Sequence, residues 1–302
     1  MTNLADELIR QGARVSIIDD LTTGFRENLE EIEGDFDFVE GDINDDAALS
    51  KAIEGAEIVF HEAALPSVPR SVDDPAETHR VCVDGTFNLL IKAKALGIKR
   101  FVYAASSSAY GDQPILPKVE TMRPDPLSPY AVAKLAGEYY CRAFHNVYGL
   151  ETISLRYFNV FGPRQNPASM YSGVISRFID ALLTDKPAVI YGDGDQSRDF
   201  TYISNVVDSN IKAAQTTLRL GETINVANGE RTTLNELLEV LKIITNTPDA
   251  IAEYQPPRSG DVKHSQADNR RAIECLDYKG IIGLEEGLRK TVDWWKSSRF
   301  AK

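Results

Sequence analysis

A single apolar run, together with the polar residues that follow it, constrains this sequence most strongly. Residues 100–105, RFVYAA, are typical of a buried parallel strand. The run ends in three consecutive serines, Ser106, Ser107 and Ser108. Because open α/β sheets bind ligands at the carboxyl ends of their strands, we expect these hydroxyls to lie at a binding site.

A tyrosine and a lysine follow on a predicted helix. Ser128 and Pro129 are typical of a helix start. Tyr130 and Lys134, four residues apart, are therefore predicted to share one face of that helix. An ammonium near a phenol favours the phenolate and lowers its pKa from an ordinary value of about 10. Tyr130 is thus a candidate general base. A tyrosine and a lysine at this spacing are by themselves also typical of a solvated helix face. The preceding strand and its serines are what favour a catalytic site here.

The composition is that of an ordinary folded protein of one large or two ordinary domains, with 302 residues, 43% apolar and 26% charged. Its 33 basic and 45 acidic residues give a net charge of −12, which disfavours nucleic acid and anionic membranes as partners. Cys82, Cys141 and Cys275 are scattered, as in reduced cytoplasmic proteins. We find no metal-ligand spacing, no signal peptide at Met1 and no apolar run of about 18 residues that would span a membrane.

The first half alternates strands with helices, as a dinucleotide-binding fold does. A strand predicted over residues 15–18 closes on Asp19 and Asp20. In such folds an acidic residue after the second strand binds the adenine ribose, about 20 residues beyond a glycine-rich turn. Counting back from Asp19 places that turn at or before Met1, so it is missing from the sequence. Further strands are predicted over residues 36–39, 58–61 and 151–157, and a long helix over residues 75–96.

These motifs resemble the extended short-chain dehydrogenase/reductases, in particular the nucleotide-sugar 4-epimerases of the NAD-dependent epimerase/dehydratase family. The resemblance covers nearly the whole chain. It implies an α/β fold: a Rossmann-type doubly wound parallel sheet over residues 1–165, which binds NAD, and a smaller α/β nucleotide-sugar domain over residues 166–302. Part of residues 198–215 is expected to pack back on the first domain. The resemblance also implies a homodimer formed through the helix over residues 75–96 and the helix that bears Tyr130.

The resemblance assigns roles to individual residues. Ser106 is the catalytic hydroxyl, Tyr130 the base, and Lys134 the residue that holds both Tyr130 and the nicotinamide ribose. Cys82 stands where relatives usually carry an asparagine, and His61 is expected to pack at a strand end. The residues implied to contact NAD are Asp19, Asp20, Asp42, Ile43, Ala63, Ala64, Tyr130, Lys134, Tyr157 and Val160.

A second group of residues is implied to bind the sugar nucleotide. The run RYFNVFGPRQ over residues 156–165 places Asn159 on the diphosphate. Arg198 and Arg258 would grip the same group, since a guanidinium binds phosphate through two hydrogen bonds. Asp261, in the sequence RSGD, would bind the uridine ribose. Ser107 and Ser108 face the sugar, and Ser265, four residues after Asp261, is a small residue where a bulky one would exclude an N-acetyl group.

The N-terminus departs from the family pattern. Family members begin with a strand and a GxxGxxG turn before a helix like residues 3–11. The first strand is central to the sheet, so without it two strand edges are expected to lie open and the helix N-terminus that holds pyrophosphate to be lost. Such a chain is expected to fold poorly and bind cofactor weakly. We expect the sequence to lack its true N-terminus, for example through a misplaced start codon at Met1; a natural short variant is the alternative.

The expected function is NAD-dependent inversion at C4 of a UDP-hexose through a 4-keto intermediate. Ser265 predicts interconversion of UDP-GlcNAc and UDP-GalNAc, with some activity on UDP-glucose and UDP-galactose. Nucleotide-sugar dehydratases need an Asp-Glu pair where Ser107 and Ser108 stand, which disfavours that reaction. A UDP-glucuronate epimerase or decarboxylase, and a nucleotide-sugar binder without turnover, stay open as alternatives.

Overall fold

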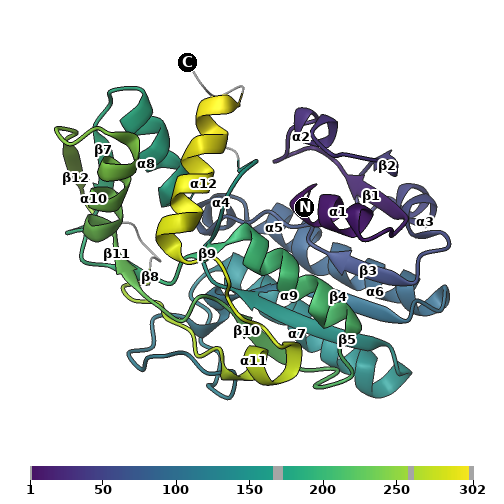
Figure 1. Ribbon diagram of the computed structural model, residues 1–302. Helices are drawn as coiled ribbons and strands as arrows, with labels where there is room; N and C mark the ends of the chain where they lie inside the picture. Colours follow the sequence, from purple (N-terminus) through teal and green to yellow (C-terminus); the bar gives the residue numbers. More distant parts are fainter. Residues whose placement is uncertain (1, 166–172, 258–261, 299–302) are drawn as a thin grey trace.

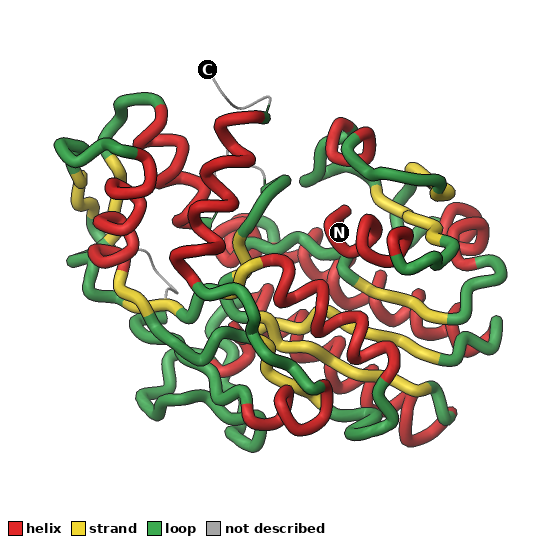
Figure 2. The backbone as a smooth tube through the Cα atoms, viewed as in Figure 1, coloured by secondary structure: helices red, strands yellow, loops and turns green. Residues whose placement is uncertain are grey.

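The computed structural model describes residues 2–165, 173–257 and 262–298 (Figure 1). Two of the predicted substrate-binding residues, Arg258 and Asp261, lie outside these ranges. The larger part of the molecule is a parallel sheet with helices on both faces, and a smaller α/β part lies beside it (Figures 1 and 2). This is the Rossmann-type α/β fold expected from the sequence.

The longer parallel strands of the larger part form two separate sheets. β1 (Val15–Asp19) pairs with β2 (Phe36–Glu40). The second sheet has the order β10-β5-β4-β3 and consists of β3 (Ile58–His61), β4 (Arg100–Ser106), β5 (Glu151–Tyr157) and β10 (Thr223–Val226). Within the described residues no strand joins β1 to β3, so each has one edge without a strand partner. This division agrees with the two open strand edges expected when the central strand is missing.

The first helix, α1 (Thr2–Arg10), packs against both β1 of the first sheet and a helix on the second sheet. Ala5 contacts the apolar cluster around Ile17 of β1, and Leu4 packs with Val207 and Ile211 of α9 (Ile203–Gln215). Within the described residues the helix runs from Thr2 onward and is anchored by its own apolar face. The expected loss of the helix N-terminus that holds pyrophosphate stays a prediction.

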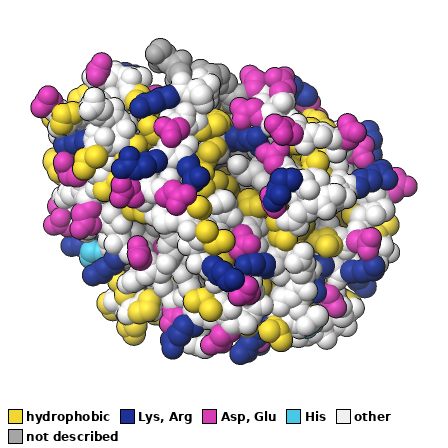
Figure 3. All heavy atoms as spheres, in the orientation of Figure 1, with side chains coloured by type: hydrophobic (Ala, Val, Ile, Leu, Met, Phe, Trp, Pro, Cys, Tyr) yellow, Lys and Arg dark blue, Asp and Glu magenta, His cyan; other side chains and the backbone are white. Residues whose placement is uncertain are grey.

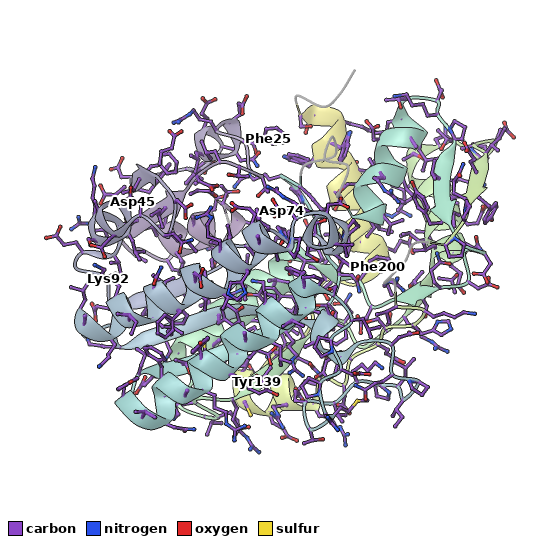
Figure 4. All side chains as sticks on the ribbon, turned by 180° about the vertical axis from the view of Figure 1, so that it is seen from behind. Phe25, Asp45, Asp74, Lys92, Tyr139 and Phe200 are labelled. Atoms are coloured by element: carbon purple, nitrogen blue, oxygen red, sulfur yellow. The ribbon has the colours of Figure 1, made fainter. Side chains whose placement is uncertain are left out.

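One face of the second sheet is covered by α6 (Gly85–Ala95) and α7 (Pro129–Tyr148), which stand in front of the strands when seen from behind (Figure 4). α3 (Asp46–Ile53) lies beside the first sheet, and its Leu49 and Ile53 join the same apolar cluster. The other face carries α9 and α11 (Arg270–Leu276). The chain therefore returns to the large sheet after residue 198. It does so more extensively than expected, because β10 and α11 join this sheet as well.

The long helix predicted over residues 75–96 is helical without interruption from Pro75 to Ala95, but its hydrogen-bonding pattern changes in the middle. It consists of α5 (Pro75–His79), a π-helical turn (Arg80–Asp84) and α6. A π-helical turn adds one residue to the turn, too small a change to disturb the apolar periodicity that predicted one helix. Gly85 follows this turn, and a side chain there would overlap Ile43, so glycine allows the helix to lie against the residues after β2.

The smaller part has its own apolar core, formed by residues such as Phe178, Ile190, Leu237 and Trp295. β7 (Ala188–Tyr191) and β12 (Ala252–Gln255) pair in parallel in this part. Its helices are α8 (Val174–Leu183), α10 (Leu234–Thr245) and α12 (Leu284–Ser297). The short elements are α2 (Glu27–Glu30), α4 (Val68–Asp73), a 3-10 turn (Ser107–Tyr110), β6 (Val160–Phe161), β8 (Ser197–Arg198), β9 (Thr201–Tyr202) and β11 (Thr232–Thr233).

The surface shows no separation of charge by sign on the face seen in Figure 3, where acidic and basic side chains are interspersed. None of the helices in the described ranges is both long and apolar enough to cross a membrane.

Candidate active site

A cavity of about 1120 Å³ opens at the carboxyl ends of the parallel strands. Every predicted site residue within the described ranges lines it, although they come from eight separate stretches of sequence. These residues are Asp19, Asp20, Asp42, Ile43, Ala63, Ala64, Ser106, Ser107, Ser108, Tyr130, Lys134, Tyr157, Asn159, Val160, Arg198 and Ser265.

Helix α7 delivers Tyr130 and Lys134 to this cavity. The Ser128 hydroxyl accepts a hydrogen bond from the Ala131 amide (3.2 Å) and so caps the helix one turn before Lys134. Gly137 lets α7 lie close to β4, since a side chain there would overlap Tyr103. Lys134 is only 3% exposed, and its Nζ donates to the Ala104 carbonyl oxygen (2.8 Å) at the end of β4. The ammonium is therefore fixed between the helix and the strand.

The serine cluster is organised around Ser106. Its Oγ accepts hydrogen bonds from the Ser108 hydroxyl (2.8 Å) and the Ser108 amide (3.2 Å). Because Ser106 accepts both of these bonds, its own hydroxyl proton is available for another acceptor. The Tyr130 phenol is such a neighbour, and the hydrogen bond with Ser106 lowers the pKa of Tyr130.

The net direction of the Tyr130 pKa is nevertheless upward. Burial raises the pKa of the phenol, and the Cys82 thiol nearby adds to the rise. The pKa of Lys134 is lowered by burial as well. The lowered Tyr130 pKa predicted from the sequence is thus wrong for this structure. The reasons are that burial disfavours the phenolate and that Lys134 bonds to Ala104 rather than to Tyr130.

The opposite side of the cavity carries the predicted sugar-nucleotide residues. The Asn159 side-chain amide donates to the Asp199 carbonyl oxygen (3.1 Å), which fixes its orientation. The Arg198 guanidinium donates to the carbonyl oxygens of Ser197 (3.0 Å) and Lys263 (3.2 Å). The Ser265 amide donates to the Ser197 carbonyl oxygen (3.0 Å). β8 therefore holds Arg198 and Ser265 side by side.

This arrangement agrees with a comparison against protein families. The model of the NAD dependent epimerase/dehydratase family matches residues 2–227. This chain belongs to that family.

Three similar members show how alike the family's structures are. The UDP-glucose 4-epimerase of Mycolicibacterium smegmatis is 38% identical, with 98% of this chain and 95% of that protein covered. The structure of UDP-N-acetylglucosamine 4-epimerase from Methanobrevibacter ruminantium M1, in complex with UDP-N-acetylmuramic acid, is 39% identical with a TM-score of 0.89, covering 98% of this chain and 94% of that chain. The structure of UDP-glucuronic acid 4-epimerase from Bacillus cereus, in complex with UDP-glucuronic acid and NAD, is 31% identical with a TM-score of 0.90, covering 98% and 95%.

NAD is the cofactor of this family, and the cavity contains groups that suit it. The Asp19 and Asp20 carboxylates accept hydrogen bonds from the Leu21 (2.8 Å) and Thr22 (2.9 Å) amides, which holds the acidic turn after β1 at the cavity. An acidic group at this point suits an adenosine ribose. The first residue described in α1, Thr2, also lines the cavity, so the positive end of that helix faces it.

Asp42 is held differently from Asp19. Its carboxylate forms an ion pair with Arg80 (2.7 Å) of the π-helical turn, and its other oxygen accepts from the Asn44 amide (2.8 Å). The pair places Asp42 and the neighbouring Ile43 on the cavity wall after β2. In this family member the unusual helical turn therefore contributes directly to the predicted adenine side of the site.

Two cavity residues were missed by the sequence analysis. The Tyr157 hydroxyl donates to the Glu62 carboxylate (2.9 Å), which follows β3 directly. A charged residue at a strand end was a usable signal for Glu62. Lys118, 2% exposed, also lines the cavity. It lies in an irregular segment, and no periodicity marks it.

His61 and Cys82 occupy packed positions beneath the site. His61 Nε2 lies 2.8 Å from the Thr86 hydroxyl, and burial lowers the pKa of His61 to about 3, so the imidazole is neutral. The packed role expected for His61 is confirmed. Cys82 is 1% exposed. Across the described ranges no group of His, Cys, Asp and Glu side chains has the arrangement of a metal site.

Proposed function

We propose that this protein catalyses NAD-dependent 4-epimerisation of a UDP-hexose through a 4-keto intermediate. The observation that carries the proposal is that Ser106, Tyr130 and Lys134 share one cavity with the acidic turn after β1. Residues 1–165 would hold the cofactor, and residues 166–302 most of the sugar nucleotide. The similar proteins that bind UDP-sugars support the same reaction class.

Tyr130 is the base in this proposal. It takes the proton from the sugar 4-hydroxyl as the C4 hydrogen leaves, and it returns that proton when the alcohol is restored. NAD, when bound, accepts the C4 hydride and gives it back to the opposite face of the sugar. Because burial raises the pKa of the phenol, Tyr130 needs nearby donors before it can hold a negative charge. Ser106 is such a donor before the sugar binds, and the Lys134 ammonium, which Ala104 holds one helical turn away, favours the phenolate through its charge.

Ser106 has a second task. Its hydroxyl accepts both hydrogen bonds that Ser108 offers, so its proton points to other acceptors. When the sugar is bound, this single proton is donated to the sugar oxygen next to Tyr130 in place of the phenol, and a donor held in place in advance stabilises charge that develops on that oxygen. Ser106 therefore orients the 4-oxygen for both proton transfers.

Inversion requires the keto sugar to turn over while its nucleotide stays bound. Asn159 and Arg198 would hold the diphosphate, together with Arg258 and with Asp261 on the uridine ribose. A firm hold on the charged part leaves the hexose free to rotate about its phosphate link. Tyr130 would then return its proton to the 4-oxygen while the hydride returns to the other face of C4, so there is no net oxidation.

The small side chain of Ser265 favours UDP-GlcNAc and UDP-GalNAc as the substrates. Ser265 lines the cavity and is anchored through its amide to β8, so a larger side chain there would project into the sugar space. The test is a panel of UDP-sugars assayed with the purified protein and added NAD. We expect turnover of both N-acetyl and plain hexoses, and Ser265→Tyr is expected to lower kcat/KM for UDP-GlcNAc at least tenfold while sparing UDP-glucose. An unchanged ratio would show that Ser265 does not set the choice of sugar.

Lys118 favours a second candidate, 4-epimerisation of UDP-glucuronate. Its ammonium donates to the Gln113 carbonyl oxygen and forms no ion pair with a described residue. Burial lowers the pKa of Lys118, and a bound carboxylate would offset that cost. The same panel decides between the candidates: faster turnover of UDP-glucuronate than of UDP-GlcNAc, lost in Lys118→Met, supports the second.

We also propose that the protein forms a homodimer through α6 and α7. These helices expose large apolar side chains on the face seen in Figure 4, where Tyr139 is labelled. Phe87 and Tyr140 contact each other there, with ring centroids 5.0 Å apart. A contiguous apolar surface of this kind marks an interaction site. The exposed residues are Phe87, Ile91, Val132, Tyr139, Tyr140, Val147 and Tyr148.

A further inference from the structure

Asp199 is a buried carboxylate for which the proposed reaction has no use. It lies between β8 and β9 and is 0% exposed. Among the described residues no lysine, arginine or histidine forms an ion pair with it. Burying an unpaired carboxylate is costly, so its place in the fold calls for an explanation.

The carboxylate is satisfied by three backbone amides. Oδ1 accepts from the Asn228 amide (3.0 Å), and Oδ2 accepts from the amides of Gly229 (3.1 Å) and Ala267 (3.0 Å). Asn228 and Gly229 belong to the turn after β10, at the edge of the large sheet. Ala267 belongs to residues 262–267, which we call the floor segment because Val262 and Ser265 line the cavity. Asp199 thus ties the floor segment to the sheet.

The floor segment lies in register along β8. The Ser197 amide donates to the Lys263 carbonyl oxygen (3.0 Å), and the Ser265 amide donates to the Ser197 carbonyl oxygen (3.0 Å). The Ala267 amide comes next in this pattern, and it is bound by the Asp199 side chain. Ser265 cannot shift along β8 without breaking that last bond.

The backbone of Asp199 supports the rest of the sugar-nucleotide side. Its carbonyl oxygen accepts the Asn159 side-chain amide (3.1 Å), and the Thr201 amide donates to the Asn159 carbonyl oxygen (3.2 Å). Arg198 is its direct neighbour in sequence. Asp199 is therefore linked to Asn159, Arg198 and, through the floor segment, Ser265. These are the described residues after β5 that are predicted to bind the sugar nucleotide.

We infer that Asp199 is a positioning residue for substrate binding: it fixes the floor segment, Asn159 and Arg198 in the arrangement that receives the UDP-sugar. The inference rests on the proposed function. It predicts that changing Asp199 weakens the binding of UDP and UDP-sugar, because Asp199 acts through residues that hold the nucleotide. It predicts little effect on kcat, because Asp199 does not contact Ser106 or Tyr130. A purely structural role would lower stability without a selective loss of nucleotide binding.

Asp199→Asn is the informative change, because it keeps the shape and removes one acceptor. The amide has a single acceptor oxygen, so at least one of the three backbone amides then faces an NH₂ group. Losing a hydrogen bond to a charged group loosens the floor segment, and we expect this to lower the affinity for UDP about tenfold or more. A matched control is Asp193→Asn, since the Asp193 carboxylate accepts one amide hydrogen bond (3.0 Å) in an exposed turn of the same domain.

The experiment measures KM and kcat for UDP-GlcNAc with NAD present, and the dissociation constant of UDP by calorimetry. For Asp199→Asn we expect KM and the UDP dissociation constant to rise about tenfold or more, with kcat changed less than about threefold. Asp193→Asn should leave all three values unchanged. A fall in kcat at constant KM and constant UDP affinity, or no change at all in a folded variant, overturns the inference.

Two further measurements keep the test decisive. If the wild-type protein binds UDP but turns over no UDP-sugar, the proposed function fails, and the UDP affinity of Asp199→Asn still reports on positioning. If Asp199→Asn does not fold, as judged by circular dichroism, Gln266→Ala takes its place. The Gln266 side chain donates to the Gly229 carbonyl oxygen (2.8 Å) and ties the same floor segment to the same turn. UDP affinity should fall severalfold in Gln266→Ala, and an unchanged affinity overturns the inference.

Discussion

Arg156→Met is expected to destabilise the protein strongly by leaving a carboxylate buried without its partner. Arg156 of β5 donates two hydrogen bonds to Glu138 of α7, at 2.8 and 2.6 Å. Their side chains are 4% and 3% exposed. The guanidinium also lies 4.5 Å from the centre of the Tyr110 ring. The pair fastens α7 to the sheet one helical turn beyond Lys134, so the helix that carries Tyr130 depends on it.

The size of the effect follows from the burial of both partners. Removing one member of a buried pair costs about 3–5 kcal/mol, because the charge that stays behind is neither solvated nor paired. Replacing both Glu138 and Arg156 with methionine removes that charge, so the double variant should lose less stability than the two single losses added together. Urea denaturation of the four proteins in the cycle measures this difference.

The pH dependence of stability is a second test of the Arg156→Met prediction. Burial raises the pKa of Glu138 above its ordinary value of 4.5, and Arg156 opposes the rise. Without Arg156 the folded-state pKa rises further, so folded Glu138 keeps its proton to higher pH than unfolded Glu138 does. Stability of Arg156→Met should then fall as the pH rises above 4.5. It should be closer to wild type at pH 4 than at pH 8.

Two results would refute this reasoning. The first is a loss for Arg156→Met below about 1 kcal/mol, which would be typical of a solvated ion pair. The second is exact additivity in the double variant, which would mean that the two side chains do not interact. Glu7→Gln serves as the control, since Glu7 pairs with Arg10 on the surface of α1, and its denaturation midpoint should match wild type.

Two further predictions concern the dimer and the buried Asp199. Tyr139→Glu should halve the mass measured by sedimentation, because it puts a charge on the exposed face of α7, whereas Tyr254→Glu on β12, a tyrosine equally exposed at 55%, should leave the mass unchanged. Burial raises the pKa of Asp199 to about 7, and Glu230 adds to the rise. Because this is above the unfolded value, wild-type stability should fall as the pH rises from about 4 to about 7, and the thermal midpoint of Asp199→Asn should show less of this fall.

The parts of the fold that the sequence predicted well have strong local signals. The strand over residues 100–105 is continuous and apolar, and α7 has a serine cap before its apolar face. The two open strand edges followed from counting residues back from Asp19. The lining of the cavity followed mainly from the family resemblance, and for Ser106, Ser107 and Ser108 also from their place at the carboxyl end of a parallel strand.

Other features depend on contacts between distant segments, which a local pattern does not record. The π-helical turn before Gly85 keeps the apolar stripe of a helix, so only its packing against Ile43 distinguishes it. The raised pKa of Tyr130 arises from burial by several segments at once. Asp199 looks like an ordinary acidic residue in the sequence, and its role is visible only when the amides of Asn228 and Ala267 are brought to it.

The most direct test of the proposed chemistry compares wild type with Tyr130→Phe in a UDP-GlcNAc epimerisation assay, with NAD added and UDP-GalNAc measured over time. Removing the phenolic hydroxyl takes away the proposed base and leaves the fold and the cavity intact. Wild type should reach an equilibrium mixture of the two sugars, and Tyr130→Phe should be about 10²–10⁴-fold slower. Equal rates for the two proteins would contradict the role of Tyr130, and no conversion of any UDP-sugar by wild type would contradict the reaction itself.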